Sequence, residues 1–325
     1  MILLNTATSL SSIIKKIEMD RPKICNFPAM YRFLKLISKL PLSVLYGVSD
    51  FMYLIIYYII RYRRKVVMEN LALCFPEKSN AERKKITKKF YRNLCDLAIE
   101  TIKAHNLSAT EIQRRVQIRG LDQIKKYHDQ GSPIFIFTGH TGNWEWMLLA
   151  CTMELNYPID PVYKPLKNKG VDRFIMEVRS RFGGTPIAKD ETVRELVKRR
   201  KLQRDVAMVA DQLPIQATEK YWAKFLGVDT AFYLGPEQLA KFTKWPVFMN
   251  SMHRTKRGHY VAEYEQITVK EGNTSNFPIL DGYINLLEKS TRKNPADWLW
   301  SHRRWKYEKP KEAGSKDHFQ NEEMY

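Results

Sequence analysis

Hydrophobic and polar positions follow two different patterns along the chain, and the change falls near residue 118. Upstream of it, residues 81–105 carry apolar side chains near one face at helical spacing, with most lysines and arginines elsewhere. Those apolar residues are Ile86, Phe90, Leu94, Leu97 and Ala98. The spacing predicts an amphipathic helix. Downstream, short apolar runs alternate with helical patterns, and this alternation is typical of an α/β core.

The apolar runs of the downstream part predict buried strands and one edge strand. The buried strands are expected at Ile134–Phe137, Pro161–Tyr163, Val206–Ala210 and Val247–Met249, and the edge strand at Tyr260–Val269. Helical spacing predicts intervening helices at Glu191–Lys201 and Gly235–Lys244. The last residues, Pro310–Tyr325, are polar and aperiodic, which predicts a loose tail.

The segment Pro41–Ile60 contains twenty mostly apolar residues and ends at the cationic run Arg61–Lys65. Its length matches a membrane-spanning helix. Asp50 lies at its centre, however, where a carboxylate costs ~2.5–3.5 kcal/mol on insertion scales. A single span and a helix lying in the interface therefore both stay open, and a buried core helix is the structural alternative. The cationic flank favours contact with anionic lipid on the cytoplasmic side.

Composition narrows the class of protein. The chain has 325 residues, of which 44% are hydrophobic, so it can form a globular body with a sizeable core. Its 54 lysines and arginines outnumber 35 acidic residues and give a net charge of +19. This charge indicates an anionic partner, such as nucleic acid, lipid headgroups or an acidic protein, or else a solvated basic surface.

The cysteines and the N-terminus add exclusions. Cys25, Cys74, Cys95 and Cys151 are scattered and form no CxxC pair, which argues against a zinc site and a disulfide framework. Reduced thiols in a protein that faces the cytoplasm are expected instead. The first twenty residues lack a basic start and a small-residue cleavage site, so they do not resemble a signal peptide.

Residues 133–145, PIFIFTGHTGNWE, combine a buried strand with the strongest candidate chemistry. The strand runs directly into His140, and Gly139 and Gly142 allow a sharp turn and a close approach to the backbone. Asn143 is a candidate N-cap, so a helix is expected to begin near residue 144. Catalytic groups collect at such strand ends in α/β folds.

His140 and Glu145 are the candidate catalytic residues. Residues five apart on one helix do not share a face, so the pair meets only if His140 lies on the loop and Glu145 on the helix. Glu145 is then expected to hydrogen-bond the imidazole, fixing its tautomer, while His140 acts as a general base. No serine or cysteine adjoins His140, which favours direct attack by a substrate hydroxyl. A structural histidine is the alternative, and a zinc site lacks further local ligands.

Five sequence blocks occur in an order shared with one group of enzymes. The blocks are NLALCFPEKSNAERKKI at Asn70–Ile86, HTGNWE at His140–Glu145, VYKPLKN at Val162–Asn168, DQ at Asp211–Gln212 and PADWLWSHRRWK at Pro295–Lys306. From about Leu36 to Lys306 the chain thereby resembles the lysophospholipid acyltransferase superfamily. Within it, the chain is similar to the lipid A biosynthesis (lauroyl/myristoyl) acyltransferase family, whose HX4(D/E) box matches HTGNWE.

The resemblance implies a fold and a location. The expected fold is α/β, a glycerol-phosphate acyltransferase-like mixed sheet flanked by helices, with an N-terminal membrane-anchoring helix. The expected parts are an N-terminal extension at 1–29, a membrane anchor at 30–65, the acyltransferase domain at 66–308 and a flexible tail at 309–325. The implied location is the inner (cytoplasmic) membrane, with the catalytic domain facing the cytoplasm.

The resemblance also implies a reaction. A fatty acyl group would pass from an acyl carrier protein or coenzyme A (CoA) thioester to a hydroxyl of a lipid A precursor, with no metal or dissociable cofactor. His140 carries over as general base and Glu145 as its partner. The same chemistry on an aminoacyl lipid or a lysophospholipid is the alternative. A nucleic-acid-binding protein and a non-catalytic membrane scaffold are the competing classes; the membrane segment argues against the first and the intact box against the second.

Candidate substrate-binding residues are Asn143, Tyr163, Lys164, Arg303 and Arg304. Lys164 stands where many relatives have arginine, and its ammonium or backbone N–H groups near residue 142 could stabilise the oxyanion of the reaction. Tyr163 is expected either to line the cleft or to pack. Arg303 and Arg304 are candidates for the phosphates or headgroup of the acceptor, against a solvated helix end.

Asp211 and His302 are further polar residues that we considered as bases, and neither is preferred to His140. Asp211 is expected to cap the loop after its strand rather than to act as a second base. His302 is a weaker catalytic candidate than His140, because it is expected to lack an acid partner.

Overall fold

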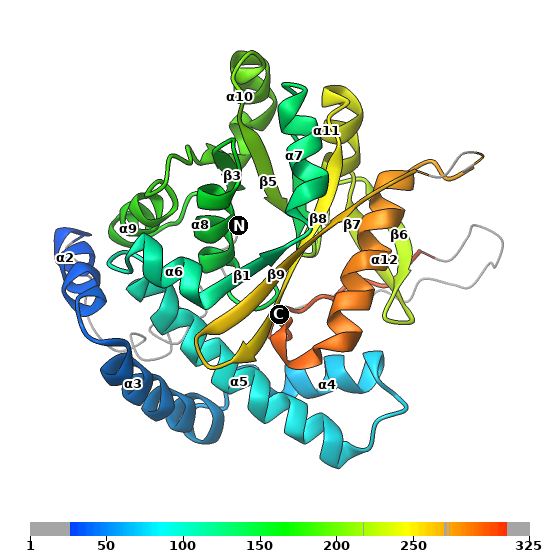
Figure 1. Cartoon of the computed structure of the whole chain (residues 1–325). Coiled ribbons are helices and arrows are strands. Elements are labelled where there is room, and N and C mark those ends of the chain that lie inside the picture. The colour runs from blue at the N-terminus through cyan, green and yellow to red at the C-terminus, as the bar shows by residue number, and fades with distance from the viewer. Residues whose placement is uncertain (1–26, 217, 270–271, 273, 311–325) are drawn as a thin grey trace.

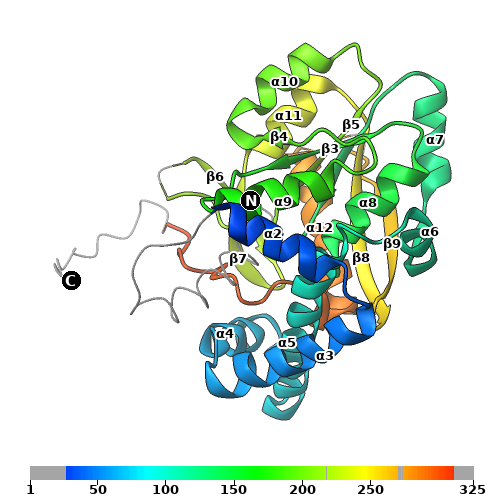
Figure 2. The same ribbon diagram turned by 90° about the vertical axis from the view of Figure 1, so that its left-hand side faces the viewer.

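The computed structural model describes residues 27–216, 218–269, 272 and 274–310. Most of the predicted extension 1–29 and of the predicted tail 309–325 therefore lies outside the described residues, as does Cys25. Within them, helices surround a central sheet on both faces, and the N-terminal helices lie along one side (Figures 1 and 2).

A seven-stranded sheet runs in the order β1-β9-β8-β2-β5-β3-β4. Its strands are β1 (Val116–Arg119), β2 (Phe135–Thr138), β3 (Ile159–Tyr163), β4 (Ile187–Ala188), β5 (Asp205–Val209), β8 (Val247–Lys256) and β9 (His259–Gln266). Neighbours are parallel except β8 and β9, which form an antiparallel hairpin. The predicted mixed α/β sheet flanked by helices is thus confirmed. A separate antiparallel hairpin, β6 (Lys220–Phe225) with β7 (Val228–Tyr233), was not predicted.

One strand prediction is wrong in position. Residues 260–269 were expected to form an edge strand, but β9 lies between β1 and β8, and the edges are β1 and β4. The short strand β1, which was not predicted, pairs with β9 and covers it, with Val116 opposite Tyr260. The four predicted buried strands are confirmed as β2, β3, β5 and β8.

The helices account for the remaining regular structure. They are α2 (Phe27–Ser38), α3 (Leu42–Leu54), α4 (Arg64–Cys74), α5 (Asn80–Lys103), α6 (Ala109–Arg115), α7 (Leu121–Asp129), α8 (Trp144–Glu154), α9 (Lys169–Arg179), α10 (Thr192–Arg199), α11 (Gly235–Thr243) and α12 (Pro278–Lys293). Short 3₁₀ turns cover Lys189–Glu191 and Pro295–Asp297. The helices predicted from spacing are confirmed as α5, α10 and α11.

Helix α5 shows why these residues fold as predicted. Ser79 and Glu82 form a reciprocal capping box at its start, which satisfies N–H groups that the helix leaves open. Its apolar face, including Phe90 and Leu94, is buried against the rest of the core. In Figure 1 this helix passes below the sheet.

The predicted anchor segment forms α3 and then a π-helical turn, Ile55–Ile59. It packs on α5 through Leu45, Ser49 and Tyr53, which are buried. Only 28% of Leu42–Ile59 is buried, so the segment is not a core helix of the folded domain. By length and composition alone it is the one helix in the described part of the chain that could cross a membrane.

Candidate active site

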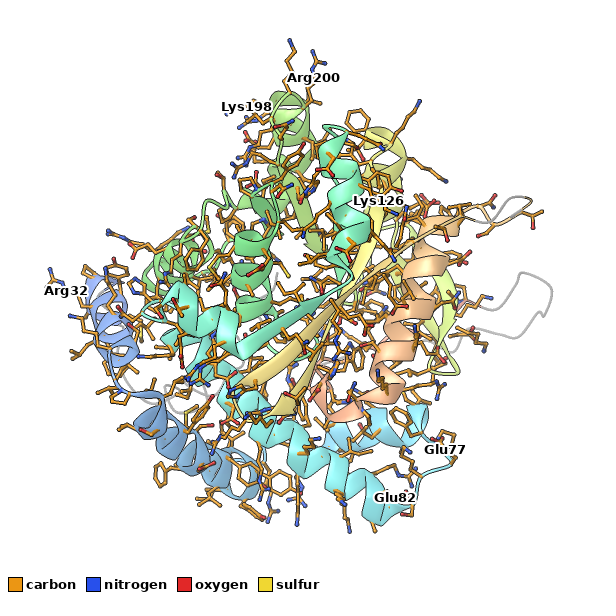
Figure 3. All side chains as sticks on the ribbon, viewed as in Figure 1. Arg32, Glu77, Glu82, Lys126, Lys198 and Arg200 are labelled. Carbon is orange, nitrogen blue, oxygen red and sulfur yellow. The ribbon has the colours of Figure 1, made fainter. Side chains whose placement is uncertain are left out.

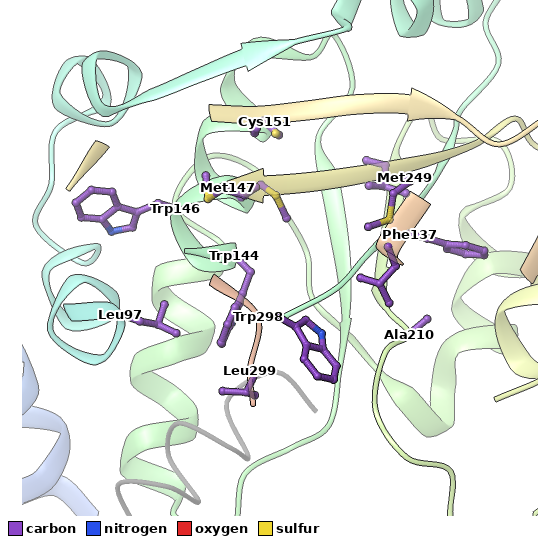
Figure 4. Close-up of a cluster of buried hydrophobic side chains, with 14 of the residues drawn as sticks. Leu97, Phe137, Trp144, Trp146, Met147, Cys151, Ala210, Met249, Trp298 and Leu299 are labelled. Carbon is purple, nitrogen blue, oxygen red and sulfur yellow. The ribbon is translucent and has the colours of Figure 1, made fainter. Parts of the chain in front are cut away.

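The loop after β2 has the predicted strand–turn–helix form. Helix α8 begins at Trp144, and the Asn143 side chain caps it by accepting a hydrogen bond from the backbone N–H of Trp146 at 3.0 Å. Gly142 has φ +59°, and a Cβ there would lie 3.0 Å from the carbonyl oxygen of Met252. The tight turn therefore makes room for the protein's own strand β8. Buried apolar side chains, including Trp144 and Trp298, surround the loop (Figure 4).

His140 is held by Asp211, which follows strand β5. Its Nδ1 lies 2.5 Å from Asp211 Oδ1, while Asp211 Oδ2 accepts from the backbone N–H of His140 and from Trp298 Nε1, both at 2.8 Å. Because an ionised carboxylate can only accept, Nδ1 carries the proton. Nε2 then holds the lone pair, 3.2 Å from the side-chain nitrogen of Gln212.

Electrostatics keeps Asp211 charged in a buried place. Burial by itself raises the pKa of this carboxyl, but the imidazole of His140 and the hydrogen bonds from His140 and Trp298 hold its pKa below the ordinary value. Asp211 was expected to cap its own loop. It instead contacts the loop after β2 and the imidazole, a role the sequence analysis missed. The sequence signal for this role was the position of Asp211 directly after a buried strand. His140 also follows the carboxyl end of a buried strand.

The predicted hydrogen bond between Glu145 and His140 is wrong for this structure. Both oxygens of Glu145 accept from Arg179, with Oε1 2.7 Å from one terminal nitrogen and Oε2 3.0 Å from Nε. The two side chains are at most 2% exposed. The bidentate carboxylate compensates the buried charge of Arg179, so Glu145 on the first turn of α8 meets the end of α9 rather than the imidazole.

A narrow apolar cavity adjoins this ion pair. Glu145 and Arg179 line it together with side chains from β2, β3, β5 and α8, among them Met147, Ile159 and Met208. His140 does not line it: the imidazole is 1% exposed, and Trp144 packs edge-on against it with ring centroids 5.0 Å apart. The base candidate is therefore closed off in this conformation.

The Asn143 side chain is bound within the protein, and its predicted substrate contact stays a prediction. It is fully buried, and its side-chain N–H group donates to Glu100 on α5 at 2.7 Å. Its oxygen is taken by the helix cap described above. Both polar groups of the amide are therefore used within the protein, and the residue fixes the loop to α5.

Tyr163 and Lys164 lie at the carboxyl end of β3. Tyr163 is half-buried, burial raises the pKa of its phenol, and Lys164 is exposed. No described hydrogen bond or ion pair joins either residue to His140 or Glu145. Their predicted substrate contacts stay predictions.

The C-terminal segment 297–305 crosses the loop that carries His140. Leu299 N–H donates to the carbonyl oxygen of His140 at 3.1 Å, and Gly142 N–H donates to Asp297 O at 3.0 Å. This segment has no helix after the 3₁₀ turn, so the alternative of a solvated helix end is wrong. Arg303 is exposed, whereas Arg304 is buried, and the basic cluster is thereby split.

Arg304 is an unusual cation. Its side chain is 1% exposed, its guanidinium lies 4.6 Å from the ring centre of Phe232, and none of its three nitrogens has a hydrogen-bond partner among the described residues. Burial lowers the pKa of this guanidinium to about 10, while the charge of Asp211 opposes that shift. Arg304 is therefore protonated at neutral pH, and it lies near enough to Asp211 for the two charges to interact.

His302 differs from His140. Its Nε2 accepts a hydrogen bond from the backbone N–H of Leu213 at 3.1 Å. Burial and the nearby charge of Arg304 lower its pKa to about 3, so this imidazole is neutral in the folded protein. A structural role fits these contacts.

The described residues contain no group of three or more histidine, cysteine or acidic side chains that could hold a metal ion. Cys74, Cys95 and Cys151 are buried free thiols.

Comparison with known proteins agrees with the motif order. The model of the bacterial lipid A biosynthesis acyltransferase family matches residues 13–307. The chain belongs to this family. It is 25% identical over 246 residues to a lipid A biosynthesis palmitoleoyltransferase of Escherichia coli K12, covering 75% of this chain and 79% of the relative. It is 22% identical over 205 residues to a lipid A biosynthesis acyltransferase of Haemophilus influenzae, covering 62% of this chain and 63% of the relative.

Family membership confirms the resemblance drawn from the five blocks and makes the chain an acyltransferase of lipid A biosynthesis. The competing classes, a nucleic-acid-binding protein and a non-catalytic scaffold, are set aside by this assignment.

Proposed function

We propose that the protein transfers a fatty acyl group from an acyl carrier protein or CoA thioester to a hydroxyl of a lipid A precursor, at the cytoplasmic face of the inner membrane. His140 is the general base. The observation that carries this role is the 2.5 Å contact between His140 Nδ1 and the buried carboxylate of Asp211. This contact keeps the proton on Nδ1 and leaves Nε2 free to accept one. Base catalysis requires this tautomer of the imidazole.

The reaction then proceeds without a covalent acyl-enzyme. Nε2 of His140 takes the proton of the acceptor hydroxyl as its oxygen attacks the thioester carbonyl. The new C–O bond forms, the C–S bond breaks, and the departing thiolate receives the proton from the imidazolium. Asp211 stabilises the imidazolium in between, so we assign it the orienting role predicted for Glu145.

Glu145 becomes a positioning residue in this proposal. Its ion pair with Arg179 fixes the start of α8, and thereby the end of the loop that carries His140. The competing proposal retains the original prediction, in which Glu145 turns to the imidazole when substrate enters. Hydrogen bonds in an empty site are often rearranged in the complex, and variants of the two carboxylates separate the proposals.

Cations near the site suit an anionic substrate. No described residue hydrogen-bonds the guanidinium of Arg304, so it is available to a developing oxyanion or a phosphate, and a buried cation gains much from such a partner. Lys164 and Arg303 are exposed and supply charge for acceptor phosphates. Because His140 is 1% exposed, substrate entry requires the Gln212 side chain to leave Nε2.

The test is acyl transfer by the purified protein, with several acyl-carrier-protein and CoA thioesters as donors. His140→Ala should reduce turnover on the order of 10²–10⁴-fold. His259→Ala, which removes a histidine at the start of β9 in the β8–β9 hairpin, is the matched control. Near-normal turnover by His140→Ala would refute the base assignment.

Mass spectrometry of total lipids from cells with and without the gene tests the acceptor. Loss of one acyl chain from lipid A supports the proposal. Loss of an acyl chain from an aminoacyl lipid or a phospholipid, with lipid A unchanged, would replace the acceptor but retain the chemistry.

A further inference from the structure

Helices α2 and α3, the turn between them and the π-helical turn after α3 present a set of large apolar side chains to solvent. They are Phe33, Leu36, Leu40, Val44, Val48, Phe51, Leu54, Tyr58 and Ile59, and we call them the apolar face. The spacing within each helix, three or four residues apart, places them on one side. The two helices follow one another along one side of the molecule (Figures 1 and 2). A large exposed apolar patch marks a contact surface for a partner or a membrane.

The other side of α3 is fastened to the catalytic domain by polar contacts. Ser49 donates to the buried Asp96 at 2.6 Å, and Tyr46 donates to Glu100 at 2.8 Å. Asp50, the central carboxylate of the segment, pairs with Arg257 at 2.7 and 3.0 Å. From the sequence alone, Asp50 opposed membrane insertion. In the structure its carboxylate pairs with Arg257 of the catalytic domain.

Helix α2 is fastened as well. Lys103 on α5 donates to the carbonyl oxygens of Ser38 and Leu40, at 3.1 and 2.9 Å, in the turn between α2 and α3. Tyr31 donates to Glu177 on α9 at 2.7 Å.

These contacts oppose a spanning orientation. A spanning α3 would bring Asp50, Asp96 and Arg257 to the depth of the hydrocarbon, where ionised groups are costly. It would otherwise have to break all the contacts with α5. Lying in the interface, the same helix buries its apolar face in lipid and retains every polar contact on its other side.

Basic residues border the apolar face. Arg32 and Lys39 on and after α2 are exposed, as are Arg61 and Lys65 beyond the π-helical turn. The turn at residues 61–63 is hydrogen-bonded to the C-terminal segment. Arg63, whose φ of +48° is left-handed, donates to the carbonyl oxygen of Ser301 at 3.0 Å. Such a border fits the headgroups of anionic lipids, each cation near the surface contributing on the order of 1 kcal/mol.

We infer that α2 and α3 form an in-plane docking surface for an anionic lipid leaflet and do not cross it. The apolar face enters the upper acyl region, and the basic border meets the headgroups. The candidate site is linked to this surface, because Glu100 joins Tyr46 of α3 to Asn143 of the His140 loop, at 2.8 and 2.7 Å. The inference deepens the proposed function by naming how the enzyme meets its lipid acceptor.

Extraction of membranes from cells that express the full chain tests the orientation. An interfacial surface should release most of the protein into alkaline carbonate. Retention of most of the protein in the pellet after this wash would overturn the inference and assign a spanning helix.

Vesicle sedimentation tests the surface itself. The double variant Phe51→Ser, Ile59→Ser should bind vesicles of phosphatidylethanolamine and phosphatidylglycerol roughly tenfold or more weakly than the wild type, because two large side chains no longer enter the lipid. The matched control is Val193→Ser, Val197→Ser, which removes two exposed apolar side chains from α10, away from α2 and α3 (Figure 1). Equal binding by the Phe51, Ile59 variant and the control would overturn the inference.

Charge reversal provides a second pair. Arg32→Glu with Arg61→Glu should weaken binding to these anionic vesicles roughly tenfold or more, and binding to pure phosphatidylcholine much less. Lys198→Glu with Arg200→Glu makes the same charge change at the opposite end of the molecule from α3 (Figure 3). Equal losses from both pairs would mean that net charge, not this surface, binds the lipid.

Acyl transfer to a detergent-dispersed acceptor separates this inference from the proposed function. The Phe51, Ile59 variant should retain wild-type turnover there while losing vesicle binding. A wild type that binds vesicles through this surface but transfers no acyl group would refute the function and leave the docking surface standing.

Discussion

The loop after β2 and the loop after β5 contribute differently to the site. The first, residues 139–145, supplies the imidazole of His140, but its own carboxylate, Glu145, pairs with Arg179. The second, residues 210–213, supplies groups that contact the imidazoles of His140 and His302. Asp211 and Gln212 contact the two nitrogens of His140, and the Leu213 N–H donates to His302.

The sheet explains this division. Strands β2 and β5 are parallel neighbours, with Thr138 opposite Val209, so their carboxyl ends bring the two loops together although 71 residues separate His140 from Asp211. Glu145 is close to His140 in sequence, but the chain has already entered α8 and turned toward α9. Adjacency across the sheet thus decides which acid meets the base, and the predictions below test that rule.

Asp211→Asn should have the largest effect. An amide cannot stabilise the imidazolium and allows the wrong tautomer, so turnover should fall on the order of 10²–10⁴-fold with KM little changed. The measurement is steady-state acyl transfer, with thermal unfolding to show that the variant is folded. Asp122→Asn, at an exposed position on α7, is the control. Turnover near the wild-type value would remove Asp211 from the mechanism.

Substitution of Glu145 should chiefly lower the free energy of unfolding of the protein, rather than act directly on the reaction. Glu145→Leu leaves the Arg179 guanidinium buried without an anion and should cost about 3–5 kcal/mol of unfolding free energy. The double variant Glu145→Leu, Arg179→Leu should recover a large part of this loss, because the two residues are coupled. Denaturant unfolding of both single variants and the double variant measures the coupling.

The same variants decide between the two carboxylates. If the double variant is stable and turns over at a rate near that of the wild type, Glu145 acts through Arg179, as proposed here. A stable double variant with turnover as low as that of Asp211→Asn would return the orienting role to Glu145.

Local signals explain what the sequence predicted around the site. The apolar run before His140, the glycine with positive φ at 142 and the capping Asn143 each act within a few residues, and strand, turn and helix were predicted correctly. The contact with Asp211 depends on which strands are neighbours, and no periodicity states that order. Arg179 gave no signal, because an arginine at the end of an amphipathic helix is normally solvated.

The fold shows the same limit elsewhere. Residues 260–269 were predicted to form an edge strand, because the four residues of β1 are too few to be recognised as a partner strand. For α3, apolar composition predicted membrane contact, whereas the partner of Asp50 is Arg257, 207 residues away. Long-range ion pairs of this kind require the folded chain.

Substitution of His302, which contacts Leu213 in the loop after β5, should have the smallest effect. The folded pKa of His302, about 3, lies below the ordinary value of 6.5, because the imidazole is buried and lies near the charge of Arg304. Between these values the unfolded chain binds one more proton, so stability is retained above about pH 6.5 and falls as the pH is lowered, by at most about 1.4 kcal/mol per pH unit. His302→Asn keeps an acceptor but does not titrate, and it should flatten the dependence of unfolding free energy on pH between 5 and 7, measured in urea. His259→Asn is the control; an unchanged slope in His302→Asn would show that the fold does not keep this imidazole neutral.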